Sequence, residues 1–156
     1  MRDFIEQLRS SGKITEIRQS VSREFEAPRI AKKTQGPVLF HDIEGKKAIM
    51  NLLGTRDELA VMFGVPRDMI IQRLSEVQPE GEVVIVSESP TMEIVDEEVD
   101  LYSLPIMKHF AKDGGLYITA GIVVSEYEGS MNASIHRLMV LGKDKLAARL
   151  DRKSVV

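Results

Sequence analysis

Cysteine and tryptophan are both missing from this 156-residue sequence, and aromatic residues make up only 5% of it. Without cysteine the chain can form no disulfide, and it offers neither a thiolate metal ligand nor a cysteine nucleophile. With so few aromatic rings, the core must rest on Ile, Val, Leu and the eight methionines, and methionine in most cores fills gaps. Any chemistry therefore falls to side chains that carry oxygen or nitrogen.

Long apolar runs and an excess of basic residues are also missing. No stretch approaches the roughly 18 apolar residues of a membrane-spanning helix, and the charged, periodic start lacks the apolar core of a secretory signal. The net charge of −3 indicates no broad basic surface of the kind that binds a phosphate backbone. We therefore predict a cytoplasmic protein with no membrane span and no nucleic-acid partner.

The composition that remains is typical of a folded protein, with 43% hydrophobic and 29% charged residues. The length fits one ordinary domain or two small ones. The composition changes near residues 90–105, where an acidic run occupies 96–100, so we predict two units, 1–100 and 101–156. The acidic run is either a site for a divalent cation or a solvated linker, and its irregular spacing favours the linker.

Apolar residues in the first hundred positions follow helical spacing in some segments and strand-like spacing in others. Thr55 and Glu58 have the spacing of a capping box, and Pro28 is placed to open a helix. His41 and Asp42 are neighbours, and we expect them at a solvated strand end rather than in a catalytic dyad. In chain order we expect a helix over 3–10, a strand through Ile17, a helix from Pro28, a hairpin or two neighbouring strands over 37–53, helices over 55–63 and 67–77, and strand-like runs at 83–86 and 92–95.

The stretch Asp113–Arg137, DGGLYITAGIVVSEYEGSMNASIHR, carries the residues of most chemical interest. Tyr117–Ser125 is rich in β-branched residues, Glu128-Gly129 is a turn dipeptide, and Ser134–Leu141 again mixes apolar and polar residues. These features predict a β-hairpin with Asn, Ser, His and Arg on its return strand.

On a regular strand Ser134 and His136 share one face, whereas Ile135 and Arg137 share the other. Asn132 and Arg137 then point to opposite sides, and a bulge near Asn132 or a ligand along the strand end is needed to join them. Their five residue steps cover about 16 Å, close to the length of a flavin mononucleotide. An Asn oxygen can ligate a metal, a Ser hydroxyl can donate to phosphate and an Arg can hold a carboxylate. From the residues alone the ordinary alternative is favoured, in which Asn132 caps the turn, His136 is a surface histidine or a strand histidine with its hydrogen bonds satisfied, and Arg137 forms an ion pair.

Two motifs occur together in this region: DGGLYIT at 113–119 and N-x-S-x-x-R from Asn132 to Arg137. The chain also contains the segments DFIEQLRSSGKITEI, GPVLFHDIEG, NLLGTRDELA, DLYSLPIMKHFAKDGGLYITAG and NASIHRLMV. In this combination the chain resembles the UbiD family of prenylated-FMN-dependent decarboxylases, which are 3-polyprenyl-4-hydroxybenzoate carboxy-lyase-like. The resemblance implies an α+β fold, with an N-terminal α/β domain over 1–100 and the first strands of a split β-barrel similar to flavin reductases over 101–156.

The resemblance also implies a reaction: reversible non-oxidative decarboxylation of an aromatic or α,β-unsaturated carboxylic acid, by covalent catalysis through prenylated FMN. Family members hold Mn2+, or another divalent metal, and K+ at the cofactor phosphate, and a flavin prenyltransferase supplies the cofactor. By motif position Asn132 resembles the Asn that binds the metal and the cofactor. Ser134 and Ile135 resemble cofactor contacts, and Arg137 resembles the arginine that serves catalysis and also binds the cofactor.

The family's metal-ligating His and Glu, its catalytic glutamates and a later cofactor-binding Lys have no counterpart in these 156 residues. The resemblance therefore implies a chain that covers the N-terminal part of the family, is incomplete and is inactive alone. Unpaired strand edges in a half barrel predict a homo-oligomer. Two alternatives stay open: a non-catalytic flavin-binding or assembly module completed by a partner chain, and a folded remnant without ligand.

Overall fold

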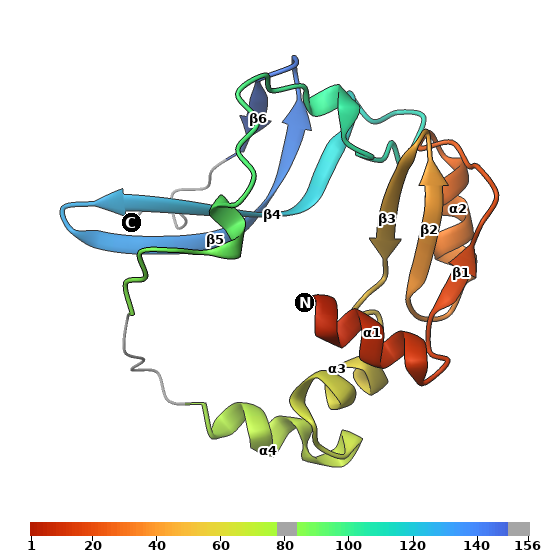
Figure 1. Cartoon of the computed structure of the whole chain (residues 1–156), viewed down its shortest axis with the longest axis vertical. Coiled ribbons are helices and arrows are strands. Elements are labelled where there is room, and N and C mark those ends of the chain that lie inside the picture. The colour runs from red at the N-terminus through yellow and green to blue at the C-terminus, as the bar shows by residue number, and fades with distance from the viewer. Residues whose placement is uncertain (78–83, 150–156) are drawn as a thin grey trace.

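The structure, a computed structural model, describes residues 1–77 and 84–149 (Figure 1). Within these residues it contains two three-stranded sheets, of order β1-β2-β3 and β4-β5-β6. This mixed architecture confirms the α+β class predicted from the sequence. The elements are α1 (Arg2–Ser10), β1 (Thr15–Ile17), α2 (Glu26–Lys33), β2 (Val38–Ile43), β3 (Lys46–Met50), α3 (Arg56–Phe63), α4 (Ile70–Ser75), β4 (Tyr117–Tyr127), β5 (Ser130–Val140) and β6 (Leu146–Ala148), with 3-10 turns at Arg67–Met69, Pro90–Met92 and Leu101–Ser103.

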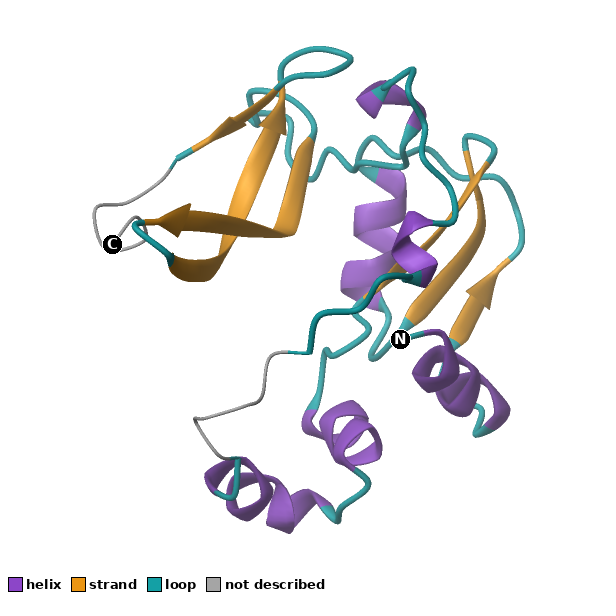
Figure 2. Ribbon diagram, turned by 60° about the vertical axis from the view of Figure 1, so that its left-hand side comes forward, coloured by secondary structure: helices purple, strands orange, loops and turns teal. Residues whose placement is uncertain are grey.

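The first sheet is built on β2, whose side chains Val38, Phe40 and Ile43 are at most 1% exposed. β2 pairs in parallel with β1 and antiparallel with β3. Helix α2 connects the two parallel strands and lies beside the sheet (Figure 2). Its residues Ala27 and Ala31 pack into the same core. Each fully buried Val, Ile or Phe contributes roughly 1.5–3 kcal/mol to folding, so this core holds the first half together. The predicted first strand and the hairpin that follows α2 are both confirmed.

Helix α3 begins where the sequence predicts, because Thr55 and Glu58 form a capping box. The Asp57 N–H donates to Thr55 Oγ1 at 3.2 Å, and the Thr55 N–H donates to Glu58 Oε2 at 2.6 Å. Glu58 is only 5% exposed, so its carboxylate depends on these donors for the hydrogen bonds that water would otherwise supply. The cap therefore fixes both the start of α3 and the burial of Glu58.

Two helix boundaries differ from the prediction. Pro28 is the third residue of α2 rather than its first, a position where the missing N–H still costs no intrahelical hydrogen bond. The helix expected over 67–77 starts as a 3-10 turn and continues as α4 only to Ser75. Its apolar residues Ile71 and Leu74 are 74% and 50% exposed, so little tertiary packing supports a longer helix. No helix in the described residues is long and apolar enough to cross a membrane.

The strand-like runs expected at 83–86 and 92–95 do not form strands in the described part, and Val83 lies outside it. Ile85 is 92% exposed and Ile94 is 87% exposed. Apolar β-branched residues form a strand only where a neighbouring edge accepts their backbone hydrogen bonds, and neither run pairs with a sheet. The prediction was wrong for this reason, and the passage instead contains one short 3-10 turn at Pro90–Met92.

Residues 101–108 lie against the first sheet, although they belong to the second predicted unit. Met107 is buried in the core of that sheet, and the Lys108 N–H donates to the Arg23 carbonyl at 3.1 Å. In return the Phe25 N–H donates to the Lys108 carbonyl at 3.0 Å, and Arg23 Nη1 donates to the Tyr102 carbonyl at 2.8 Å. The boundary near residue 100 stays a prediction, and this segment is the connection between the two sheets.

The second sheet is the long hairpin predicted from the sequence, extended by β6. Its turn residues Glu128 and Gly129 both have positive φ, 49° and 78°, the type I′ geometry that matches the twist of a two-residue hairpin. Pairing of β4 with β5 is regular from Tyr127–Ser130 to Gly121–His136. β6 pairs with β5 at Leu138–Val140. The return strand therefore presents its polar residues in a fixed alternation.

Candidate functional site

Strand β5 carries the predicted site residues on two faces. Asn132, Ser134 and His136 are half-buried on one face, whereas Ile135 and Arg137 are exposed on the other. Ser134 Oγ lies 2.7 Å from His136 Nε2, a hydrogen bond between residues two positions apart on the same face. The expected alternation is therefore present, and His136 is a half-buried strand histidine whose ring is hydrogen-bonded to Ser134, as the ordinary alternative allows.

Arg137 lies over an aromatic ring on the other face. Its Cζ is 5.4 Å from the centroid of the Tyr117 ring, a cation–π geometry worth about 0.5–1 kcal/mol at an exposed site. The contact places the guanidinium at the start of β4, because Tyr117 is the first residue of that strand. The ion pair that the ordinary alternative assigned to Arg137 does not occur among the described residues.

A β-bulge lies beside Arg137. Ile118 pairs with Leu138 and Gly121 pairs with His136, so Thr119 and Ala120 together face the single residue Arg137. The bulge is therefore on β4 at Arg137, and pairing near Asn132 is regular. The structure does not bring Asn132 and Arg137 to one face.

The outer edge of β5 offers a way to reach both faces. Among the described residues, the side of β5 away from β4 pairs only at Leu138–Val140, with β6. Residues 130–137 consequently border β4 alone. An elongated ligand lying along this edge can touch Asn132 and Ser134 from one side and Arg137 from the other. This is the second of the two arrangements that the sequence left open.

The polar face suits an anionic phosphate better than it suits a metal ion alone. Ser134 supplies a hydroxyl donor and Asn132 an amide with both a donor and an acceptor. No group of three His, Cys, Asp or Glu residues that could hold a metal occurs in the described part of the chain. Glu126, a conceivable substitute ligand, pairs with Met131 and so belongs to the opposite face from Asn132. Asn132 therefore fits a metal as one ligand among others that a phosphate and further side chains would provide.

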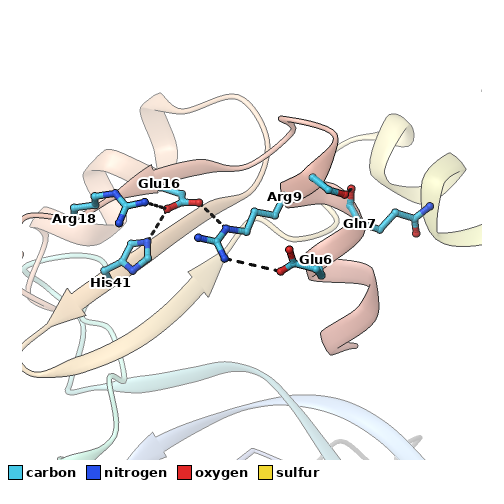
Figure 3. Close-up of polar contacts among 7 residues, drawn as sticks. Glu6, Gln7, Arg9, Glu16, Arg18 and His41 are labelled. Carbon is cyan, nitrogen blue, oxygen red and sulfur yellow. Dashed lines mark hydrogen bonds and ion pairs between the residues drawn. The ribbon is translucent and has the colours of Figure 1, made fainter.

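A second polar cluster, in the first sheet, was not predicted (Figure 3). The Glu16 carboxylate accepts from Arg9 Nε at 2.8 Å and from Arg18 Nη2 at 2.7 Å, and lies 2.9 Å from His41 Nε2. The hydrogen bond from Arg9, followed by that from His41, lowers the pKa of Glu16 to about 2. His41 is thus half-buried and bonded to Glu16, which corrects the expectation of a solvated strand end.

Two family models match the sequence, one in each half. Residues 5–78 match the 3-octaprenyl-4-hydroxybenzoate carboxy-lyase N-terminal domain, and residues 83–155 match the Rift-related domain of the same enzyme family. The two matches together cover nearly the whole sequence.

Curated relatives point to the same family. Anhydromevalonate phosphate decarboxylase of Methanosarcina mazei is 68% identical over 149 residues, which is 96% of this chain and 35% of the relative. The protein of the same name from Archaeoglobus fulgidus is 38% identical over 114 residues, covering 73% of this chain and 26% of the relative. The chain therefore spans about a third of the length of these relatives, or less.

Solved structures share the fold. An evolved dimeric form of the UbiD-class enzyme HmfF from Pelotomaculum thermopropionicum, in complex with prFMN, is 30% identical with a TM-score of 0.85, covering 97% of this chain and 38% of that structure. The apo 3,4-dihydroxybenzoic acid decarboxylase AroY of Klebsiella pneumoniae, at 21% identity and a TM-score of 0.86, shares 97% of this chain and 36% of its own. Because both family domains, the curated relatives and the solved folds agree along the sequence, the chain belongs to the UbiD family of carboxy-lyases.

Proposed function

We propose that this chain forms one half of a prenylated-FMN site in a UbiD-type carboxy-lyase, which removes or exchanges carbon dioxide on an α,β-unsaturated or aromatic acid. The observation that carries the proposal is the arrangement along β5. Asn132 and Ser134 occupy a half-buried polar face, and Arg137 stands five residues away on the other face, beside an edge that borders no other strand in the described residues. The HmfF relatives, at 30% identity, hold prFMN and FMN, which supports the choice of cofactor.

Each residue has a distinct role in this proposal. The Asn132 side-chain oxygen would be one ligand of a divalent metal, such as Mn2+, and this metal together with K+ would offset the negative charge of the cofactor phosphate. The Ser134 hydroxyl donates to the phosphate. Ile135, 73% exposed, offers an apolar surface to the flavin ring. Arg137 holds the substrate carboxylate through two parallel N–H donors.

The chemistry divides between the cofactor and the chain. Prenylated FMN supplies, when bound, the electron sink for the electron pair that remains when carbon dioxide leaves. Arg137 contributes orientation and positive charge, because its planar guanidinium matches the geometry of a carboxylate. Tyr117, stacked on that guanidinium, limits the directions in which it can point. The glutamic acid that returns a proton to the substrate carbon in the family has no counterpart on the described part of β5.

The name of the relative from Methanosarcina mazei supports a specific choice of substrate. At 68% identity over 149 residues, it is named for anhydromevalonate phosphate, and we propose this phosphorylated unsaturated acid as the substrate of the enzyme to which the chain belongs. The remaining parts of the proposal are a split β-barrel around β4–β6, supply of the cofactor by a flavin prenyltransferase, assembly as a homo-oligomer and a cytoplasmic location.

A second function, a non-catalytic flavin-binding module completed by a partner chain, is favoured by one observation. The polar face of β5 carries no carboxylate among its half-buried residues, so it has a phosphate donor and no acid to move a proton. The first function requires such an acid to come from other residues of the enzyme. The second requires only that flavin binds.

The experiment that separates these functions is purification of the chain after co-expression with a flavin prenyltransferase. The visible spectrum reports bound flavin, and release of carbon dioxide from anhydromevalonate phosphate reports turnover. Colour in the chain alone reports flavin binding, which both functions require. Turnover after the C-terminal part of a full-length family member is added supports the first function, and colour that stays without turnover after this addition supports the second. A colourless protein under conditions where a full-length family member is coloured contradicts both, and Asn132→Ala, which removes the proposed metal ligand, provides the matched control for specific colour.

A further inference from the structure

The hydrogen bond between Ser134 and His136 can run in either direction. Ser134 Oγ and His136 Nε2 are 2.7 Å apart, and both residues are half-buried. A serine hydroxyl has one hydrogen and two lone pairs, and a neutral imidazole nitrogen either donates or accepts according to its tautomer. If Nε2 accepts, it takes the only hydrogen that Ser134 has. If Nε2 donates, that hydrogen is free for another acceptor.

A bound phosphate selects one direction. Its oxygens accept hydrogen bonds, so the Ser134 hydroxyl must donate to them and can then only accept from His136. We propose that His136 is a positioning residue for the cofactor phosphate: its Nε2–H donates to Ser134 Oγ and turns the hydroxyl hydrogen of Ser134 toward the phosphate. The inference rests on the proposed function, since it requires a phosphate-bearing ligand at the polar face of β5. It adds a residue whose role does not follow from the N-x-S-x-x-R spacing.

The surroundings of His136 on β4 leave this geometry undisturbed. The residue directly opposite is Gly121, which has no side chain to compete for the imidazole. The space there is closed by packing, because a β-carbon at Gly121 would lie 2.9 Å from Leu138 Cδ1 and 3.3 Å from the His136 carbonyl. No side chain on β4 therefore faces His136 directly, and Ser134 is the hydrogen-bond partner of its ring along the strand.

A double-mutant cycle tests the inference with FMN and riboflavin as probes, because riboflavin lacks the phosphate. In the full chain, Ser134→Ala lowers FMN affinity about tenfold, the value of one hydrogen bond to a charged group. His136→Leu lowers it about three- to tenfold, since an unguided hydroxyl still reaches the phosphate but loses rotational freedom on binding. Neither variant changes riboflavin affinity. In the Ser134→Ala background His136→Leu lowers FMN affinity no further. In the chain that keeps Ser134, His136→Gln retains an N–H donor and binds FMN more tightly than His136→Leu does.

A spectroscopic measurement separates positioning from a structural role. The chain has three histidines, so comparison with His136→Gln assigns the 15N signals of the His136 ring. In the FMN complex these signals report the proton on Nε2, whereas riboflavin produces no such selection. A proton on Nδ1 in the FMN complex overturns the inference, as does equal weakening of FMN and riboflavin by His136→Leu.

Failure of the inference and failure of the proposed function give different results. If wild-type chain binds FMN more tightly than riboflavin, and His136→Leu keeps that preference in full, only the role of His136 is wrong. If the wild-type chain does not distinguish FMN from riboflavin, or binds neither, the phosphate does not bind to this face of β5. Both the role of His136 and the proposed cofactor site are then wrong.

Discussion

Arg137 packs on Tyr117 across the base of the hairpin, with its Cζ 5.4 Å from the ring centroid, and the β-bulge at Thr119 and Ala120 lies directly opposite it. The bulge gives Arg137 two residues of β4 as neighbours instead of one, and bulges often occur where a strand must redirect a side chain near a functional site. The orientation of Arg137 therefore depends on β4 as much as on its own strand.

Loss of the Tyr117 ring should uncouple Arg137 from β4. We expect Tyr117→Leu to weaken the interaction with Arg137 by about 0.5–1 kcal/mol in a double-mutant cycle with Arg137→Met, because the cation loses the ring face. Tyr117→Phe keeps the ring and most of its interaction with Arg137, so the coupling energy from the cycle with Tyr117→Phe should be much smaller than that from the cycle with Tyr117→Leu. Urea unfolding of the four chains of each cycle measures the effect, and coupling of equal size for Leu and Phe would contradict it.

The turn residue Glu128 should be replaceable with a gain in stability. It adopts φ 49°, where a side chain other than Asn or Gly is strained, and Gly129 follows at φ 78°. Glu128→Asn creates the Asn-Gly pair preferred in type I′ turns and should raise the free energy of unfolding by roughly 0.5–1 kcal/mol. Glu126→Asn, the same chemical change inside β4, serves as the control and should not stabilise. A loss of stability in Glu128→Asn would contradict the assigned turn.

Removal of the α3 cap should be costly. Thr55→Ala deletes the acceptor for the Asp57 N–H and loosens the buried Glu58, so we expect a loss of about 1–2 kcal/mol in the free energy of unfolding. Thr55→Ser keeps the hydroxyl and should recover most of it. Ser89→Ala, which removes the cap of an exposed 3-10 turn, is the matched control and should change stability by less than about 0.5 kcal/mol. Equal effects of the two alanine variants would contradict the capping argument.

The Glu16 cluster should make the first half of the chain sensitive to acid. The pKa of Glu16 falls from 4.5 to about 2 in the folded chain, chiefly through its hydrogen bond from Arg9. A carboxyl whose pKa is lower in the folded state stabilises above its unfolded pKa, and this contribution is lost as pH falls from about 4.5 to 2. Comparison of wild-type and Glu16→Gln unfolding at each pH should show a difference that is present at pH 6 and has gone by pH 2. A difference independent of pH would contradict the assignment.

The exposed apolar face of the hairpin should drive association. Ile122, Val124 and Met131 are 70%, 59% and 72% exposed, on the face of β4 and β5 opposite Asn132. Contiguous apolar residues of this kind favour self-association in water. Ile122→Lys with Val124→Lys should lower the average mass measured by light scattering at high concentration. Ser125→Lys, on the polar face, is the control, and a monomeric wild-type chain would contradict the prediction.

Local signals in the sequence predicted local structure well. The capping box joins Thr55 and Glu58, which are three positions apart, and the turn consists of the adjacent residues Glu128 and Gly129, so both patterns can be read directly from the sequence. The alternation of Ser134 and His136 likewise follows from the strand period.

Features that depend on partners distant in sequence were not predicted. The Glu16 cluster joins residues from α1, β1 and β2, and nothing in the spacing of Arg9, Glu16 and His41 indicates that they meet. The apolar residues around Ile85 and Ile94 have strand-like composition but no neighbouring edge. The bulge lies opposite Arg137 rather than near Asn132 because register is set by pairing across the hairpin, which the sequence of one strand does not contain.

The burial of Met107 in the core of the first sheet has a consequence for the order in which the chain folds. This core also contains Val21 and Phe40, which leave the ribosome long before Met107. During synthesis the core of the first sheet therefore stays incomplete until residues 101–108 have been made and pack beside Arg23 and Phe25. The closing contact spans more than eighty positions, so it raises the contact order of an otherwise local fold and should slow its final step.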